Sequence, residues 1–83
     1  MSATRRLNVR FFALLREQAG CRELTIETTA ANPTELYAEL SRTHGLQVPA
    51  AILAFAINER YASADAALAD GDRVTFIPPV AGG

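Results

Sequence analysis

Polar and apolar residues alternate between residues 5 and 14, as they do in a strand with one buried face. The predicted inward positions are Leu7, Val9, Phe11 and Ala13. Phe12 then falls on the solvent side, next to Arg10, so the pattern predicts a large exposed aromatic side chain. Residues 14–21 are typical of a turn or short helical segment that closes at Gly20.

The next two patterns predict a second strand and a helix. Leu24, Ile26 and Thr28 alternate with polar residues, so this strand should form a hairpin with the first through a long loop. Asn32 can cap a helix and Pro33 suits its first position, so we expect a helix from Pro33 to about His44. Gly45 follows, and a glycine in the left-handed conformation commonly ends a helix. The apolar stripe of this helix, which should lie on the sheet, consists of Leu36, Leu40 and the aliphatic parts of Tyr37 and Thr43.

The second half of the chain reads as strands. Residues 53–58 are almost continuously apolar, which favours a buried strand, and residues 58–60 read as a turn into a brief strand at residues 61–62. The turn signal at residues 70–72 precedes a last strand over residues 73–77. In that strand Val74 and Phe76 face inward and Ile77 faces outward.

Two prolines follow the last strand. Pro78 and Pro79 have no backbone N–H to donate, so strand pairing should stop there. The order strand, strand, helix, strand, short strand, strand predicts an α+β roll. We expect a mixed sheet of four to five strands with one main helix packed on one face. At 83 residues the chain fits one domain, residues 1–83, with residues 78–83 as a projecting tail.

Composition removes several classes of protein. One cysteine and one histidine cannot form an internal disulfide or a four-ligand metal cage. The longest apolar run has ten residues, against roughly 20 for a membrane span. Arg10 interrupts the apolar N-terminal run, so we expect no secretory leader, no membrane partner and a cytoplasmic location. Net charge is −1, with the positive charges concentrated before residue 23. This split favours a solvated sheet face over a nucleic-acid partner.

Few side chains indicate chemistry. The sequence has no glycine-rich phosphate loop and no zinc-protease motif. Asp70 and Asp72 are more typical of a turn than of a cation site. Cys21 is more simply a small tolerated side chain than a reactive thiol. His44 suits the end of a helix, where a positive charge complements the helix dipole.

The two terminal glycines are the remaining candidate. Gly82 and Gly83 lack a Cβ, so their backbone could enter a channel too narrow for other residues, and the last one presents a carboxylate. A carboxylate is a poor electrophile and needs a leaving group before its carbon reacts. No nucleotide motif is present to install one, so a partner enzyme would have to do so.

Several segments together resemble a known family. They are residues 9–13, 15–17, 56–58 and 70–74, and the ending Phe-Ile-Pro-Pro-Val-Ala-Gly-Gly at residues 76–83. In this order and spacing they resemble the small subunits of molybdopterin synthase, which are ubiquitin-like β-grasp sulfur carriers. The Pro-Pro-Val-x-Gly-Gly ending after Asp-Gly-Asp is the most specific part. Gly-Gly alone would suit any ubiquitin-like carrier.

The resemblance implies a function for the tail. An activating enzyme similar to ubiquitin's E1 would use ATP to adenylate the Gly83 carboxylate, and sulfur from a sulfurtransferase or cysteine desulfurase would displace AMP to leave a thiocarboxylate. Within a heterotetramer the tail would enter the large synthase subunit and donate sulfur to cyclic pyranopterin monophosphate, forming the dithiolene. The chain itself would bind no cofactor and would not be catalytic alone.

The same resemblance suggests a docking surface. Phe12, Tyr61 and Ile77 are apolar on a face that alternation predicts to be exposed, and they could dock the large subunit with Arg16 as a polar contact. The tail residues of this interface would be Pro78, Pro79, Val80 and Ala81. The alternative is that these are ordinary scattered apolar side chains.

Three other functions stay open at this point. The chain could carry sulfur for thiamine or for tRNA thiolation, it could modify proteins in the manner of ubiquitin, or it could be an interaction module that uses its sheet face. The chain contains no lysine, so it offers no side-chain acceptor for its own tail.

Overall fold

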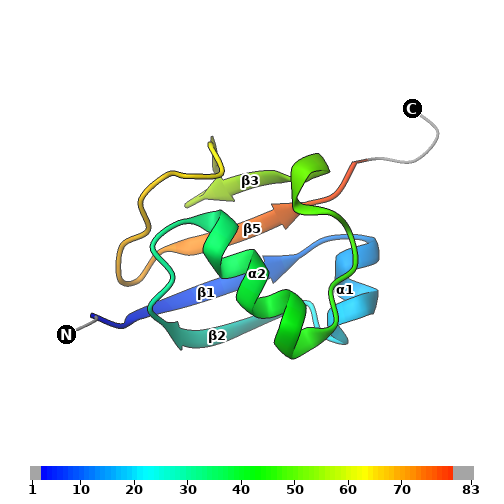
Figure 1. Cartoon of the computed structure of the whole chain (residues 1–83), viewed down its shortest axis with the longest axis horizontal. Coiled ribbons are helices and arrows are strands. Elements are labelled where there is room, and N and C mark those ends of the chain that lie inside the picture. The colour runs from blue at the N-terminus through cyan, green and yellow to red at the C-terminus, as the bar shows by residue number, and fades with distance from the viewer. Residues whose placement is uncertain (1–2, 80–83) are drawn as a thin grey trace.

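The computed structural model describes residues 3–79. They form five strands, two α-helices and one 3₁₀ turn (Figure 1). In chain order these are β1 (Arg5–Phe11), α1 (Leu14–Ala19), β2 (Glu23–Thr28), α2 (Pro33–His44), η1 (Ala50–Ile52), β3 (Ala54–Ile57), β4 (Arg60–Ala62) and β5 (Arg73–Ile77).

The strands form one mixed sheet in the order β2-β1-β5-β3-β4. β1 and β5 pair in parallel at its centre, and the other neighbours pair antiparallel. Helix α2 lies across one face of the sheet, as Figure 1 shows, and the opposite face is called the outer face below. This arrangement is the ubiquitin-like β-grasp roll, so the predicted fold is confirmed.

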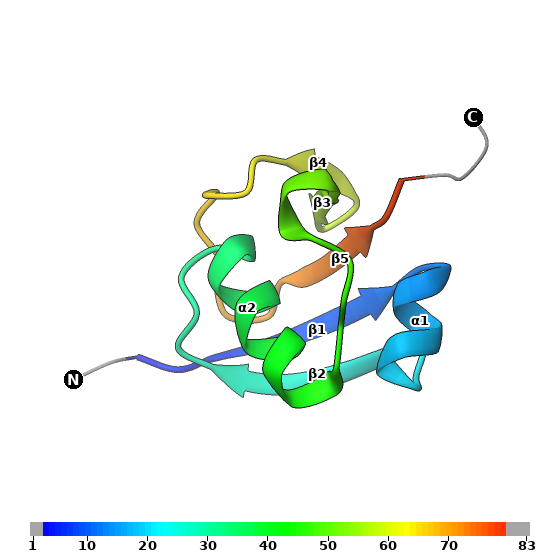
Figure 2. The same cartoon turned by 45° about the vertical axis from the view of Figure 1, so that its right-hand side comes forward.

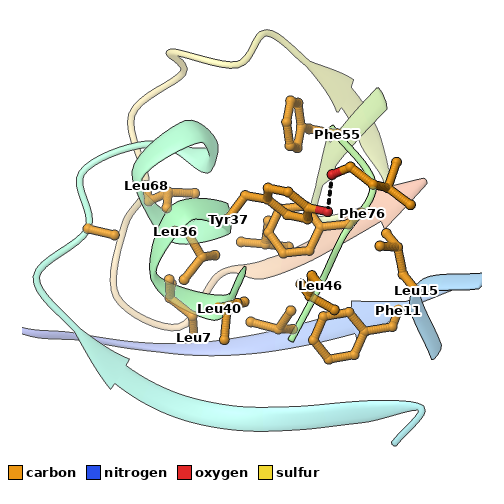
Figure 3. Packing of buried hydrophobic residues seen from close by; sticks show 14 residues of the cluster. Leu7, Phe11, Leu15, Leu36, Tyr37, Leu40, Leu46, Phe55, Leu68 and Phe76 are labelled. Atoms are coloured by element: carbon orange, nitrogen blue, oxygen red, sulfur yellow. Dashed lines mark hydrogen bonds between the residues drawn. The ribbon is translucent and has the colours of Figure 1, made fainter. Parts of the chain in front are cut away.

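The core lies between α2 and the sheet, and Phe76 of β5 is at its centre (Figure 3). The Phe76 ring meets the rings of Phe55 and Tyr37 edge to face, at centroid distances of 5.6 and 5.2 Å, and the ring of Phe11 at 6.2 Å. Such aromatic pairs add about 0.5–1.5 kcal/mol each to the gain from burying their surface. The strand that carries the tail is therefore firmly anchored.

Local signals set the ends of α2 where the sequence predicts them. The Asn32 side chain accepts a hydrogen bond from the Glu35 backbone N–H, and Gly45 is left-handed at φ 70°. Leu36, Tyr37 and Leu40 are buried as expected. The prediction for Thr43 was wrong, because this residue is exposed and its hydroxyl donates to the Glu39 carbonyl within the helix.

The end of β1 also differs from the alternation. The strand stops at Phe11, and Ala13 is exposed instead of inward. Its backbone has φ 50° and ψ −125°, which reverses the chain into α1. Because this conformation breaks the extended geometry, the two-residue period no longer decides which face Ala13 occupies.

Within residues 3–79, no helix has the length and apolar character needed to cross a bilayer.

Candidate functional site at the root of the C-terminal tail

The site is built on the end of β5. This strand lies between β1 and β3, and it leads directly into Pro78 and Pro79, called the tail root below. Strand pairing ends at Ile77, as the two prolines predict. Val80, Ala81, Gly82 and Gly83, the predicted reactive end, lie outside the described residues. The described part of the site is therefore the surface from which the tail leaves.

A hollow of about 220 Å³ lies on the outer face beside Ile77. It is lined by Phe12, Tyr61 and Ile77, together with Arg10, Ala56, Glu59 and Thr75, and is called the outer-face hollow below. Four neighbouring strands contribute to this lining, because β5 pairs with β1 on one side and with β3 on the other, and β3 pairs with β4. The structure thus brings together the three apolar residues that the sequence singles out, while their role in docking stays a prediction.

Arg16 does not belong to this hollow. It lies exposed on α1, and among residues 3–79 it makes no ion pair. The positively charged residue that lines this hollow is Arg10, and its guanidinium carbon lies 6.0 Å from the centre of the Phe12 ring. At this distance a guanidinium is weakly attracted to an aromatic face.

A second, larger hollow of about 580 Å³ lies at the end of the sheet where the central strands β1 and β5 stop, next to the tail root. Figures 1 and 2 show that α1, the segment after α2, η1 and the tail root all gather at this end of the molecule. It is called the edge groove below, and its lining residues are Ala13, Leu14, Gln18, Gln47, Val48, Pro49, Ile52, Pro78 and Pro79.

The exposed large apolar side chains of the described chain all border these two hollows. Phe12 and Tyr61, exposed by 46% and 81%, line the outer-face hollow. Leu14 and Ile52, exposed by 49% and 53%, line the edge groove. Scattered exposed apolar residues are ordinary, so this set is a candidate interaction surface because its members gather around two neighbouring hollows near the end of β5.

Sequence reasoning missed Leu14 and Ile52. Leu14 precedes Leu15, which is fully buried, and a six-residue helix cannot bury two adjacent leucines on one face. The pair of adjacent leucines was therefore the feature of the sequence that could have identified Leu14 as exposed. Ile52 lies within a long apolar run, so hydrophobicity alone did not distinguish it from buried neighbours.

The two hollows differ in charge. Arginine and glutamate side chains pair across the outer face, with Arg10 beside Glu23 at 3.7 Å and Arg73 beside Glu59 at 3.7 Å. Both pairs are partly exposed, so they contribute little to stability. Among residues 3–79, by contrast, the edge groove is lined by no charged residue, and its polar members are Gln18 and Gln47.

The other sequence candidates have structural roles. An Asp72 carboxylate oxygen accepts from the Ala69 N–H and another from the Asn58 amide, which fits a turn former. Cys21 is half-buried and packs against the core. Among residues 3–79 no three metal-ligating side chains cluster.

Comparison with known proteins agrees with this geometry. The ThiS family model matches residues 9–83. The chain is 37% identical over 81 residues to a molybdopterin synthase sulfur carrier subunit from Chlamydomonas reinhardtii, covering 93% of this chain and 98% of that protein.

Two solved structures share the fold. One is a complex of subunits 1 and 2 of molybdopterin-converting factor from Helicobacter pylori, with 32% identity, a TM-score of 0.65 and coverage of 94% of this chain and 99% of that one. The other is SAMP1 from Haloferax volcanii, with 24% identity, a TM-score of 0.77 and coverage of 98% and 100%. The chain therefore belongs to the ThiS family of ubiquitin-like β-grasp proteins.

Proposed function

We propose that this protein is the sulfur carrier subunit of molybdopterin synthase and that its Gly83 carboxylate carries the sulfur. One observation supports this most strongly. The ending Pro-Pro-Val-Ala-Gly-Gly follows the central strand directly, in a chain closely similar to a molybdopterin synthase sulfur carrier subunit. The surrounding surface is apolar and exposed, as a docking site for a larger subunit requires.

The chemistry belongs mainly to partner enzymes. An E1-like activating enzyme joins the Gly83 carboxylate to AMP from ATP and releases pyrophosphate, which gives the carbonyl carbon a leaving group. The terminal sulfur of a persulfide on a sulfurtransferase or cysteine desulfurase then displaces AMP, and a thiol reductant cleaves the resulting acyl disulfide to leave a thiocarboxylate on Gly83. The thiocarboxylate sulfur then attacks cyclic pyranopterin monophosphate in the large subunit, and water hydrolyses the thioester so formed, which leaves the sulfur on the pterin and restores the Gly83 carboxylate. Two carriers are consumed for each dithiolene.

This chain contributes a rigid base and a slender tail. Phe76 holds β5 in the core, and Pro78 and Pro79 restrict the backbone where the tail begins. Gly82 and Gly83 have no Cβ, so they fit a narrow channel in the partner. The outer-face hollow docks the large subunit through Phe12, Tyr61 and Ile77.

Intact mass spectrometry tests this function. After incubation with ATP, the activating enzyme and a sulfur donor, we expect a gain of about 16 Da from exchange of oxygen for sulfur. A variant lacking Gly83 is the matched control and should gain nothing. An unchanged mass in the full-length chain, with the enzymes shown to be active on another carrier, would contradict the proposal.

A second experiment separates this function from the other carrier functions. The loaded protein, mixed with the large synthase subunit and cyclic pyranopterin monophosphate, should yield the dithiolene product and return to its original mass. Sulfur transfer only to a thiamine precursor or to tRNA, or covalent attachment to lysines of other proteins on denaturing gels, would assign one of the alternative functions instead.

A further inference from the structure

The edge groove has no part in the function proposed so far. Leu14 and Ile52 are about half exposed there, on separate elements that converge beside the tail root. An isolated exposed leucine needs no explanation, but two large aliphatic side chains sharing one hollow of about 580 Å³ do.

We propose that the edge groove is a second contact surface for the large synthase subunit, which fills it with apolar side chains when it binds the tail. This inference rests on the proposed function and names a surface that the outer-face hollow does not include. The large subunit would then hold the carrier on two surfaces, at Ile77 and at the tail root.

The length of the tail supports this occupant. Four residues separate Pro79 from the reactive carboxylate of Gly83, and four extended residues span at most about 14 Å. The catalytic centre of the large subunit must therefore come within that distance of Pro79. Because Pro78 and Pro79 themselves line the groove, a protein that surrounds the tail this closely also covers the groove.

The chemistry of the lining specifies an apolar contact. No charged side chain of the described part of the chain lines the groove, although 20% of the chain is charged. Of its two glutamines, the Gln18 side-chain oxygen already accepts a hydrogen bond from the Gln47 backbone N–H at 2.8 Å. Aliphatic or aromatic side chains would thus match most of the lining, whereas a charged side chain would find no group of opposite charge there.

The groove is also preformed. Leu15, next to Leu14, is fully buried, and the Val48 carbonyl accepts the hydroxyl hydrogen of buried Tyr37, a bond drawn in Figure 3. Both walls are therefore fixed to the core. A fixed surface loses little conformational entropy on binding, which favours its use as a contact site.

The test is affinity for the isolated large subunit of the same organism, measured by isothermal titration calorimetry with Leu14→Gln and Ile52→Gln. Each residue is about half exposed, so both variants should fold. We expect each to bind at least tenfold more weakly than the unsubstituted protein. The matched control is Ala38→Gln, an exposed site on α2 that lines neither hollow, and its affinity should be unchanged.

Two further measurements decide the occupant. The rate of thiocarboxylate formation by the activating enzyme should change less than twofold in Leu14→Gln and Ile52→Gln; a loss there with unchanged large-subunit affinity would overturn the proposal. Sedimentation should show the free protein to be monomeric, and a dimer that dissociates in these variants would assign the groove to a second copy.

The outcome separates this inference from the proposed function. If the unsubstituted protein binds the large subunit and Leu14→Gln and Ile52→Gln bind equally well, the inference alone is wrong. If the unsubstituted protein neither binds the large subunit nor acquires sulfur, the proposed function fails with it.

Discussion

Ala13 is a single residue whose backbone shapes the site. It has φ 50° and ψ −125°, a conformation that costs most L-residues on the order of 1–3 kcal/mol. It also separates Phe12 of the outer-face hollow from Leu14 of the edge groove. The reversal at Ala13 thus directs two neighbouring apolar side chains to different surfaces.

Replacing Ala13 by glycine should therefore stabilise the fold. Glycine adopts positive φ without a Cβ clash, and its extra freedom in the unfolded chain offsets part of the gain, leaving about 1 kcal/mol. For a domain of this size, thermal unfolding should then shift upward by roughly 4–8 °C.

The reverse substitution, Gly45→Ala, is the matched control. Gly45 has φ 70°, and an added Cβ meets nothing within 4 Å, so only backbone strain changes. We expect this variant to lose about 1 kcal/mol. A lower melting temperature for Ala13→Gly would contradict the assignment of strain to Ala13.

The buried phenol of Tyr37 should make the free energy of unfolding fall at alkaline pH. Burial raises the pKa of its phenol above 10.0, with a smaller opposing effect from the Ser41 hydroxyl. Because the folded pKa is the higher one, this contribution is complete below the unfolded pKa and is lost as pH rises through the folded pKa. Urea unfolding at about pH 8 and about pH 11 should show this loss.

Tyr37→Phe isolates the effect. Removing the hydroxyl leaves the buried Val48 carbonyl without its donor, so this variant should be about 1–2 kcal/mol less stable near neutral pH. It should also lose less stability on going to alkaline pH than the unsubstituted protein does. Equal losses in both proteins would mean that other groups govern the alkaline limit.

At the level of elements, α2 begins with two reciprocal hydrogen bonds. The Asn32 side chain accepts from the Glu35 N–H at 2.9 Å, and the Glu35 carboxylate accepts from the Ala31 N–H at 2.8 Å. The first satisfies a backbone donor that a helix start leaves open, and the second ties Glu35 back to the residue before the cap. These two hydrogen bonds fix the residue at which α2 begins on the face of the sheet.

Asn32→Ala should lower the free energy of unfolding by about 1 kcal/mol, because the Glu35 N–H loses its acceptor. Asn32→Ser, which keeps a capping oxygen, should restore most of it. Chemical denaturation of the three proteins checks this. If the alanine and serine variants were equally destabilised, the cap would not be the cause.

The elements differ in how far local sequence predicts them. The bounds of α2 were predicted correctly from Asn32, Pro33 and Gly45, because caps act within a few residues. The turn into β4 was also foreseen, although Asn58 and Glu59 both adopt positive φ. The position of β5 between β1 and β3 was not, because strand order depends on contacts between distant segments that periodicity does not record.

At the scale of the whole molecule, the sequence predicted half of the exposed apolar surface around the tail. Phe12 and Tyr61 stand out because alternation places them on a polar face. Leu14 and Ile52 emerge only when α1 and η1 are folded against the tail root. Their exposure is a tertiary property, since each lies beside residues that are equally apolar.

Tyr61 offers the cleanest test of the outer-face hollow. It is 81% exposed, so Tyr61→Ala should leave the melting temperature nearly unchanged. Affinity for the large subunit should fall at least tenfold, or about 1.4 kcal/mol, as expected for an aromatic contact.

Thr25→Ala, on the exposed part of β2, is the comparison variant. It lines neither hollow, so it should bind like the unsubstituted protein. Should Tyr61→Ala bind as well as Thr25→Ala, the outer-face aromatic residues would be ordinary surface side chains.

The parallel pairing of β1 with β5 bears on what happens when a partner pulls on the tail. Tension applied through Pro78 runs along β5, so it would slide this strand past β1 and β3 and load their cross-strand hydrogen bonds together rather than one after another. Because these hydrogen bonds would have to break at the same time, the sheet should resist mechanical unfolding. Under the proposed function, in which a partner enzyme draws the tail into a channel, this pairing should keep the folded domain intact.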